Sequence, residues 1–219
     1  MAIDFSREEA QKERNYGPVP AGSRVLVKLH VERTQYPSRE DPDIAEAKSG
    51  LLQLPCKIEV VEGSYAGCSW FENITLQVGM QKIRLTEGQE TNAKRGGSML
   101  KAIIESVRRI DPADTSTRAD SQRQINKWTD FDGMVFPARL GINKKGYVGK
   151  DGKTYWNNSL ARIVACTDKE YNDLMRGGEF ITDGPTRGES TGTDVPQGGN
   201  GRLPYDDSPP PSERDSIPF

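Results

Sequence analysis

The sequence predicts a mainly β domain with one central helix and an acidic, unstructured C-terminal tail. Three observations support this fold class. Residues 50–77 alternate apolar and polar side chains around a glycine-bracketed turn, which is typical of a long antiparallel hairpin. Residues 98–110 place apolar side chains at helical spacing. After residue 176 Gly, Pro, Ser, Thr and acidic residues dominate, and such a segment buries too little apolar surface to fold. We therefore divide the chain into an N-terminal arm (1–19), one domain (20–176) and a tail (177–219).

The hairpin is expected to contain two strands, 52–60 and 68–77. Alternation places the even-numbered side chains of the first strand on the apolar face and Lys57 on the polar face. In the second strand Trp70 and Phe71 both have apolar neighbours, and we expect both in the core. A hairpin with one apolar face needs further strands to cover it.

The rest of the domain supplies those strands. The other expected elements are a strand at 23–32, a charged loop at 33–49, a short strand at 81–85, a loop at 87–97, the helix at 98–110, a short helix near 121–127, a strand at 134–143, a lysine-rich hairpin loop at 144–153, a strand at 155–165 with a bulge near Asn157 and Asn158, and a helical turn within 167–175. Three strands, a helix and two strands are the element order of the OB-fold, a five-stranded barrel that binds oligonucleotides. The sequence thus predicts an OB-fold with its helix between the third and fourth strands.

Composition restricts the class of protein. The formal net charge is −2, but seven acidic and three basic residues follow residue 182, so the tail is acidic and the remainder slightly basic. Three cysteines without a CxxC pair fit a reducing compartment, and one histidine leaves a zinc site short of ligands. We expect no metal, no cofactor, no catalytic set and hence no enzyme. Without an apolar run of ~20 residues or a signal-peptide pattern, a cytoplasmic protein with no membrane partner is expected.

Aromatic and basic residues interleave along the strands and loops, as in grooves that bind single-stranded nucleic acid. There, rings stack on bases at about 1–3 kcal/mol each and cations follow the phosphates. The candidate DNA-binding residues are Arg24, Lys28, Lys57, Trp128, Arg139, Lys144, Lys145, Tyr147, Lys150, Lys153, Tyr155 and Trp156. The lysines of the 144–153 loop, flanked by tyrosines, form the densest group. For Trp128 and Trp156 core packing is as compatible with the pattern as DNA contact.

The last residues predict a docking peptide. Asp215, Ile217, Pro218 and Phe219 end a tail that otherwise holds few hydrophobic residues. An apolar tip of this kind fills an apolar pocket, and its terminal carboxylate pairs with a neighbouring arginine. The alternative is an ordinary solvated tail.

Two resemblances bear on function. The end Asp215-Ser216-Ile217-Pro218-Phe219 resembles the tip of bacterial single-stranded DNA-binding proteins, although Ser216 and Arg214 depart from its acidic pattern. Segments within roughly 20–165 are similar to OB-fold single-stranded DNA-binding proteins of tailed bacteriophages: Lys48–Leu52, Ile58–Gly67, Trp70–Leu76, Gly133–Ala138 and Asp151–Asn157. These resemblances imply sequence-nonspecific single-stranded DNA binding in replication, recombination and repair, in the bacterial host cytoplasm if the protein is phage-encoded. They also imply that the tip recruits partner proteins.

Two other functions are compatible with the sequence. In the first, the domain is a scaffold and the tip is a decoy that occupies host replication or repair enzymes. In the second, the protein is a nucleic-acid enzyme with metal-dependent turnover, for which no ligand spacing is present. The sequence leaves open the oligomeric state, cooperativity, the choice between single and double strands, and the barrel face that binds.

Overall fold

The computed structural model describes residues 18–39, 41–143, 146–148, 152 and 154–182. Its main strands are β1 (Arg24–Val31), β3 (Leu52–Val60), β4 (Ser69–Thr75), β5 (Val135–Ile142) and β8 (Asn158–Ile163). Short strands are β2 (Ala45–Glu46), β6 (Tyr147–Val148) and β7 (Thr154–Tyr155). The helices are η1 (Val78–Met80), α1 (Glu87–Arg108), α2 (Thr117–Gln122), η2 (Trp128–Phe131) and α3 (Tyr171–Leu174). The predicted order of three main strands, a helix and two main strands is confirmed.

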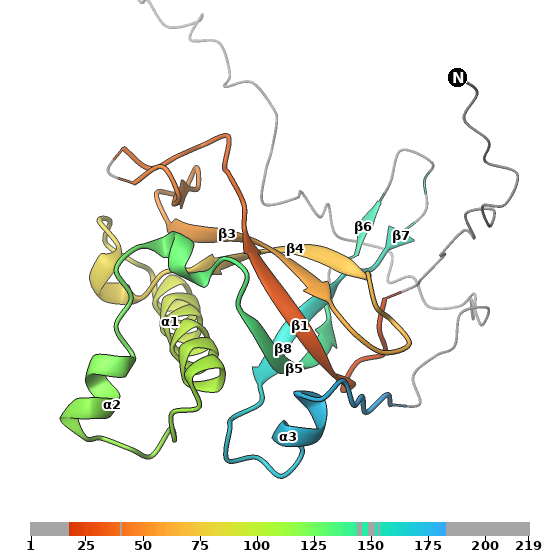
Figure 1. Ribbon diagram of the computed structural model, residues 1–219. Helices are drawn as coiled ribbons and strands as arrows, with labels where there is room; N and C mark the ends of the chain where they lie inside the picture. Colours follow the sequence, from red (N-terminus) through yellow and green to blue (C-terminus); the bar gives the residue numbers. More distant parts are fainter. Residues whose placement is uncertain (1–17, 40, 144–145, 149–151, 153, 183–219) are drawn as a thin grey trace, which may run out of the picture.

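Six strands form one antiparallel sheet in the order β2-β3-β1-β5-β8, with β4 also paired to β3 (Figure 1). Within the described residues no backbone ladder joins β4 to β8, so the sheet is open where a five-stranded barrel would close. One side chain bridges this gap. The carboxylate of Glu72 on β4 accepts a hydrogen bond of 3.0 Å from the backbone N–H of Leu160 on β8.

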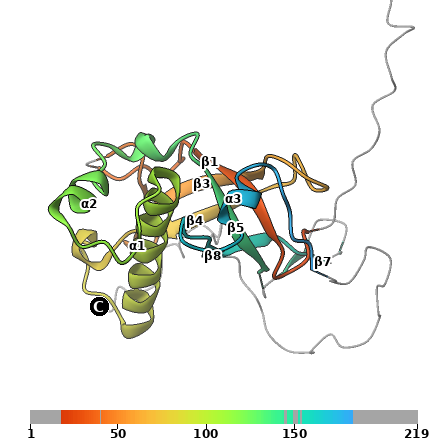
Figure 2. The ribbon, with the colours of Figure 1, turned by 60° about the horizontal axis from the view of Figure 1, so that its bottom comes forward.

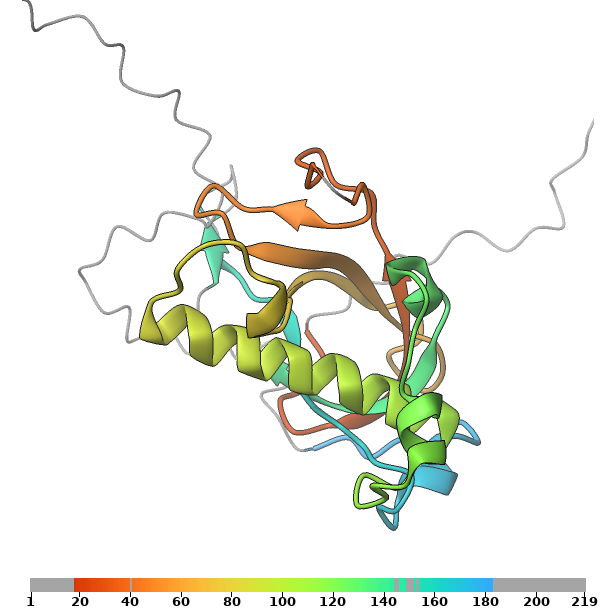
Figure 3. The ribbon, with the colours of Figure 1, turned by 90° about the vertical axis from the view of Figure 1, so that its left-hand side faces the viewer.

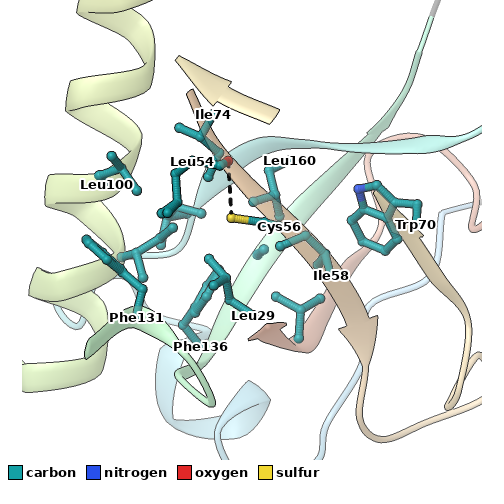
Figure 4. Packing of buried hydrophobic residues seen from close by; sticks show 14 of the residues in the cluster. Leu29, Leu54, Cys56, Ile58, Trp70, Ile74, Leu100, Phe131, Phe136 and Leu160 are labelled. Atoms are coloured by element: carbon teal, nitrogen blue, oxygen red, sulfur yellow. Dashed lines mark hydrogen bonds between the residues drawn. The ribbon is translucent and has the colours of Figure 1, made fainter. Parts of the chain in front are cut away.

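The inner face of the sheet holds the core. The predicted alternation in β3 is confirmed, because Leu54, Cys56 and Ile58 are all buried. They pack with side chains from the other main strands and with Leu100 of α1 (Figure 4). Burial of apolar surface contributes roughly 25 cal/mol per Å² and is the main stabilising term for such a sheet.

Helix α1 begins at Glu87, so the prediction of a loop at 87–97 was wrong. Thr86 and Gln89 form a capping box that satisfies the free N–H groups of the first turn. Gly96, within this segment, allows the helix to pack closely on the sheet. A Cβ at Gly96 would lie 1.8 Å from the carbonyl oxygen of Thr75, so α1 crosses β4 at a distance only glycine allows. Figure 3 shows α1 running across the sheet.

Three smaller boundaries also differ from the predictions. No strand forms at 81–85. Helix α2 starts at Thr117 because Ser116 caps it by accepting a hydrogen bond from the N–H of Ala119. The bulge lies at Ala161 rather than near Asn157 and Asn158, since Arg139 and Leu140 pair with Arg162 and Leu160. Helices α1 and α2 lie together beside the sheet (Figure 2).

The described chain continues past Gly177 and packs on the sheet. Phe180 forms a backbone bridge with Arg24 at the start of β1. The carboxylate of Glu179 accepts hydrogen bonds from the N–H of Ser64, at 2.8 Å, and from its hydroxyl. This segment ends at Thr182. The predicted arm up to residue 17 and the tail from residue 183, with Asp215, Ile217, Pro218 and Phe219, lie outside the described residues.

Candidate nucleic-acid interface

Phe71 is the most exposed large hydrophobic side chain in the described part of the chain, at 73% exposure. Its neighbour Trp70 is 4% exposed and pairs with Ile58 in the core. Successive side chains of a strand point to opposite faces, so Trp70 and Phe71 cannot both be buried here. The prediction of a core position is confirmed for Trp70 and wrong for Phe71, which stands on the outer face of β4.

Phe71, Lys57 and His30 occupy matching positions on three neighbouring strands of this face. Lys57 on β3 is directly opposite Phe71, and His30 on β1 is directly opposite Lys57. We call His30, Lys57 and Phe71 the outer-face cluster. Residues opposite each other on one face have Cβ atoms about 4.5–5.5 Å apart, so an aromatic surface and a cation are adjacent here. The predicted residue Lys28 lies on the same strand as His30, opposite Glu59.

Carboxylates lie close to Lys57 and His30 of the outer-face cluster. Glu59 lies 3.9 Å from Nζ of Lys57 and 3.6 Å from Nε2 of His30, and Asp132 lies 3.8 Å from Nδ1 of His30. These pairs are partly exposed, and exposed pairs typically contribute only about 0–1 kcal/mol. A phosphate can therefore compete with Glu59 for Lys57.

The predicted lysine-rich hairpin is present as a strand pair. Strands β6 and β7 are antiparallel, with Tyr147 opposite Tyr155. The adjacent Trp156 is 47% exposed, which is compatible with contact to a ligand. Four predicted residues lie outside the described residues: Lys144, Lys145, Lys150 and Lys153. The hairpin joins β5 to β8 and so projects from the same sheet (Figure 1).

Trp128 occupies a different place. It lies on η2, stacks on Phe131 with ring centroids 6.3 Å apart, and packs against the core. With Leu100 and Ile104 of α1 it lines a pocket of about 440 Å³ that also has polar walls, including Lys101 and Arg123. The structure does not place Trp128 in the outer-face cluster.

Arg24 and Arg139 are brought together in a second location. With Arg162 they line a cavity of about 210 Å³ whose other walls include Asp168, Glu170 and Thr182. We call this cavity the arginine pocket. Its lining includes Arg24 at the start of β1 and Glu170, which precedes α3. Figure 1 shows the start of β1 close to α3. The sequence pattern selected Arg24 and Arg139 but did not indicate that a third arginine joins them.

A longer groove of about 690 Å³ follows the unpaired edge of β4. It is lined by α1 residues, including Arg95, and by parts of β4, β5 and β8. Glu72 faces this groove, and burial raises the pKa of its carboxyl, while hydrogen bonds from Leu160 and Trp70 act in the opposite direction. The groove is an opening between the two strands that a closed barrel would pair.

The described residues hold no cluster of three or more His, Cys, Asp or Glu side chains that could bind a metal ion. Cys56, Cys68 and Cys166 form no disulfide, and burial raises the pKa of the Cys56 thiol. The part of the chain that the structure describes also contains no helix with the length and apolar character needed to cross a membrane.

Phe71 and Arg162 were not among the predicted DNA-binding residues. Phe71 could have been found by applying strict alternation from the buried position of Trp70. Arg162 could not have been found in this way, because its position opposite Arg139 depends on the bulge in β8. No protein-family model, no curated protein and no solved structure matches this chain.

Proposed function

We propose that the chain is a sequence-nonspecific single-stranded DNA-binding protein that acts in DNA replication, recombination or repair. The observation that carries this proposal is the outer-face cluster, in which an exposed phenyl ring lies beside Lys57 on a β-sheet surface. Exposed rings on a sheet are stacking platforms for unpaired bases, and neighbouring cations hold the phosphates. A duplex offers no free base faces, so this arrangement favours a single strand.

The strand pairings support an OB-type architecture for this function. β3 pairs with β1 and β4, and β5 pairs with β1 and β8, while α1 follows the third main strand. OB-folds bind oligonucleotides on the surface of their second and third strands and with neighbouring loops. Those strands correspond to β3 and β4, which carry Lys57 and Phe71. The hairpin with Trp156 would contribute the loop contacts.

The tail has two roles in this proposal. Its tip, with Ile217 and Phe219, recruits replication and recombination proteins. Its acidic stretch competes with DNA for the basic residues of the domain when DNA is absent. The protein acts in the cytoplasm, which is that of the bacterial host if the gene belongs to a phage.

The test is a titration of poly(dT) into the full chain, followed by tryptophan fluorescence at several salt concentrations. We expect quenching and a log–log salt slope of about −0.7 per phosphate contacted. The Phe71→Ala variant should bind about 5- to 150-fold more weakly, the equivalent of about 1–3 kcal/mol of lost stacking. Its unfolding midpoint should not change, because the ring is exposed.

Phe71→Trp is the matched variant. It keeps a stacking surface, so it should restore affinity, and its own emission should be quenched when DNA binds. Equal affinity of wild type, Phe71→Ala and Phe71→Trp would remove the outer-face cluster from the binding surface.

The decoy function is the alternative outcome of the same titration. Absence of poly(dT) binding at low salt, together with capture of host repair enzymes through the tail, would favour it. Cleavage of labelled DNA with Mg²⁺ or Mn²⁺ would instead indicate a nucleic-acid enzyme.

A further inference from the structure

Three arginines form a row across three neighbouring strands. Arg24 on β1 is directly opposite Arg139 on β5, and Arg139 is directly opposite Arg162 on β8. Like charges that face each other across strands destabilise a sheet. A row of three guanidinium groups therefore needs compensating negative charge from the protein or from a ligand.

The protein compensates the two outer arginines. Nη1 of Arg24 donates to Glu170 at 2.9 Å, and Nη2 of Arg162 donates to both carboxylate oxygens of Asp168 at 3.0 and 3.2 Å. The hydrogen bond from Arg24 lowers the pKa of Glu170, so this carboxylate stays ionised at neutral pH. These ion pairs balance the charges of the two outer guanidinium groups.

The central arginine is not compensated. Arg139 is exposed and has no hydrogen-bond or ion-pair partner within the part of the chain that the structure describes. In addition, Nε of Arg24 is buried in this region without a hydrogen-bond partner. The guanidinium of Arg24 also lies over the ring of Phe180, with Cζ 5.2 Å from the ring centroid, so Arg24 is held by the protein on two sides.

The space beside Arg139 is open. The cavity of about 210 Å³ is several times the ~30 Å³ that one water occupies in the liquid. Gly22 forms part of its wall with φ of +90°, and a Cβ there would lie 3.7 Å from Nη2 of Arg139. The positive φ accounts for this glycine, and the position adds no side chain to the wall of the pocket.

We propose that the arginine pocket is a binding site for a single phosphate group, with Arg139 as its main ligand. A guanidinium presents paired N–H donors that match phosphate oxygens, and two neighbouring arginines already held by carboxylates preorganise the site. The phosphate comes either from the backbone of a bound DNA strand or from a phosphate monoester, such as a DNA 5′ end. The site itself stands on its own charges and geometry and does not depend on single-stranded DNA binding.

Thermal unfolding of the full chain in inorganic phosphate, against chloride at equal ionic strength, tests the pocket. A ligand that binds only the folded state raises the unfolding midpoint. We expect phosphate to raise the midpoint of the wild type and of Arg118→Gln, which removes an exposed arginine on α2 outside the pocket. Arg139→Gln should lose the phosphate-dependent shift. In chloride it should be at least as stable as the wild type, because a like-charge contact is gone.

Oligonucleotides with a 5′-phosphate or a 5′-hydroxyl identify the source of the phosphate. Equal weakening of both by Arg139→Gln, with a salt slope shallower by about 0.7, assigns a backbone phosphate. Weakening of the 5′-phosphorylated strand alone assigns a terminal phosphate. The proposed phosphate site is contradicted if phosphate raises the unfolding midpoint of Arg139→Gln as much as that of the wild type. It is also contradicted if phosphate does not raise the midpoint of the wild type. Both conclusions hold even if poly(dT) binds. If phosphate raises the midpoint of the wild type but not of Arg139→Gln, and poly(dT) does not bind, the phosphate site is supported and the DNA-binding proposal is contradicted.

Discussion

At the scale of single residues, Glu72 links the two strands that the backbone leaves unpaired. One carboxylate oxygen accepts hydrogen bonds from the N–H of Leu160, at 3.0 Å, and from the indole N–H of Trp70, at 3.3 Å. Burial raises the pKa of this carboxyl, so holding the charged form in place costs stability. Both donors use one oxygen, which an amide oxygen could replace.

The Glu72→Gln and Glu72→Leu variants separate the charge from the hydrogen bonds. A carboxyl whose pKa is raised by folding contributes stability that is fully present below its unfolded pKa, about 4.3, and is lost as pH rises through the folded pKa. We therefore expect the stability of Glu72→Gln relative to the wild type to increase as pH rises from 4 to 7. Glu72→Leu should lose about 1–3 kcal/mol because the buried N–H of Leu160 has no acceptor. Urea unfolding at several pH values measures both; a difference between Glu72→Gln and wild type that is constant with pH would contradict the assignment.

At the scale of elements, helix α1 contains two glycines in opposite surroundings, one tightly packed and one open. Gly96 lies where the helix crosses β4, with the carbonyl of Thr75 in the space that a Cβ would need. Gly88 lies in the first turn, and nothing lies within 4 Å of a Cβ built there. Glycine lowers helix stability by about 0.5–1 kcal/mol relative to alanine unless packing requires it.

The same substitution at the two positions should therefore have opposite effects. Gly96→Ala should destabilise the fold by about 1–3 kcal/mol or more, because α1 must move away from the sheet. Gly88→Ala should stabilise it by up to about 0.5–1 kcal/mol. Urea unfolding of both variants measures this difference. Equal effects would show that α1 does not approach β4 closely.

At the scale of the whole molecule, the charge of the tail opposes that of the domain. Seven acids and three arginines follow residue 182, and the domain is slightly basic. A tethered acidic segment raises the local concentration of negative charge and competes with DNA phosphates at low salt. The charge and the apolar tip of the tail can be tested separately.

Deletion of residues 206–219 should increase poly(dT) affinity, most strongly at low salt, and abolish capture of partner proteins. Replacement of Ile217 and Phe219 by serine keeps every acid of the tail. This variant should retain wild-type DNA affinity and lose only the partners. DNA titration and pull-down from a bacterial lysate measure the two properties. Unchanged affinity together with retained partners after the deletion would contradict both roles of the tail.

Much of the fold follows from local patterns. The alternation of β3 identified its buried side chains, and the order of the main elements was predicted because each main strand carries its own apolar period. Local patterns failed where another element determines a position. The helix includes Gly96, in a segment predicted as a loop, and the close contact of Gly96 with the carbonyl of Thr75 on β4 explains this glycine.

The candidate sites show the same division. The sequence alone selected three of the basic residues, Lys57, Arg24 and Arg139. Each lies among the polar positions of an alternating strand, so the pattern places it on the outer face. The structure alone joined Lys57 to an exposed Phe71, and Arg139 to Arg162.

The sequence by itself determined the five main strands, the apolar face of β3 and where acidic charge accumulates, because these properties depend on residues a few positions apart. Only the tertiary structure decided that β4 and β8 are joined through Glu72 rather than by a ladder, and that three arginines meet in one pocket. The physical reason is register. Pairing between strands distant in the chain is set by core packing and by the bulge at Ala161, and neither leaves a periodic pattern in the sequence.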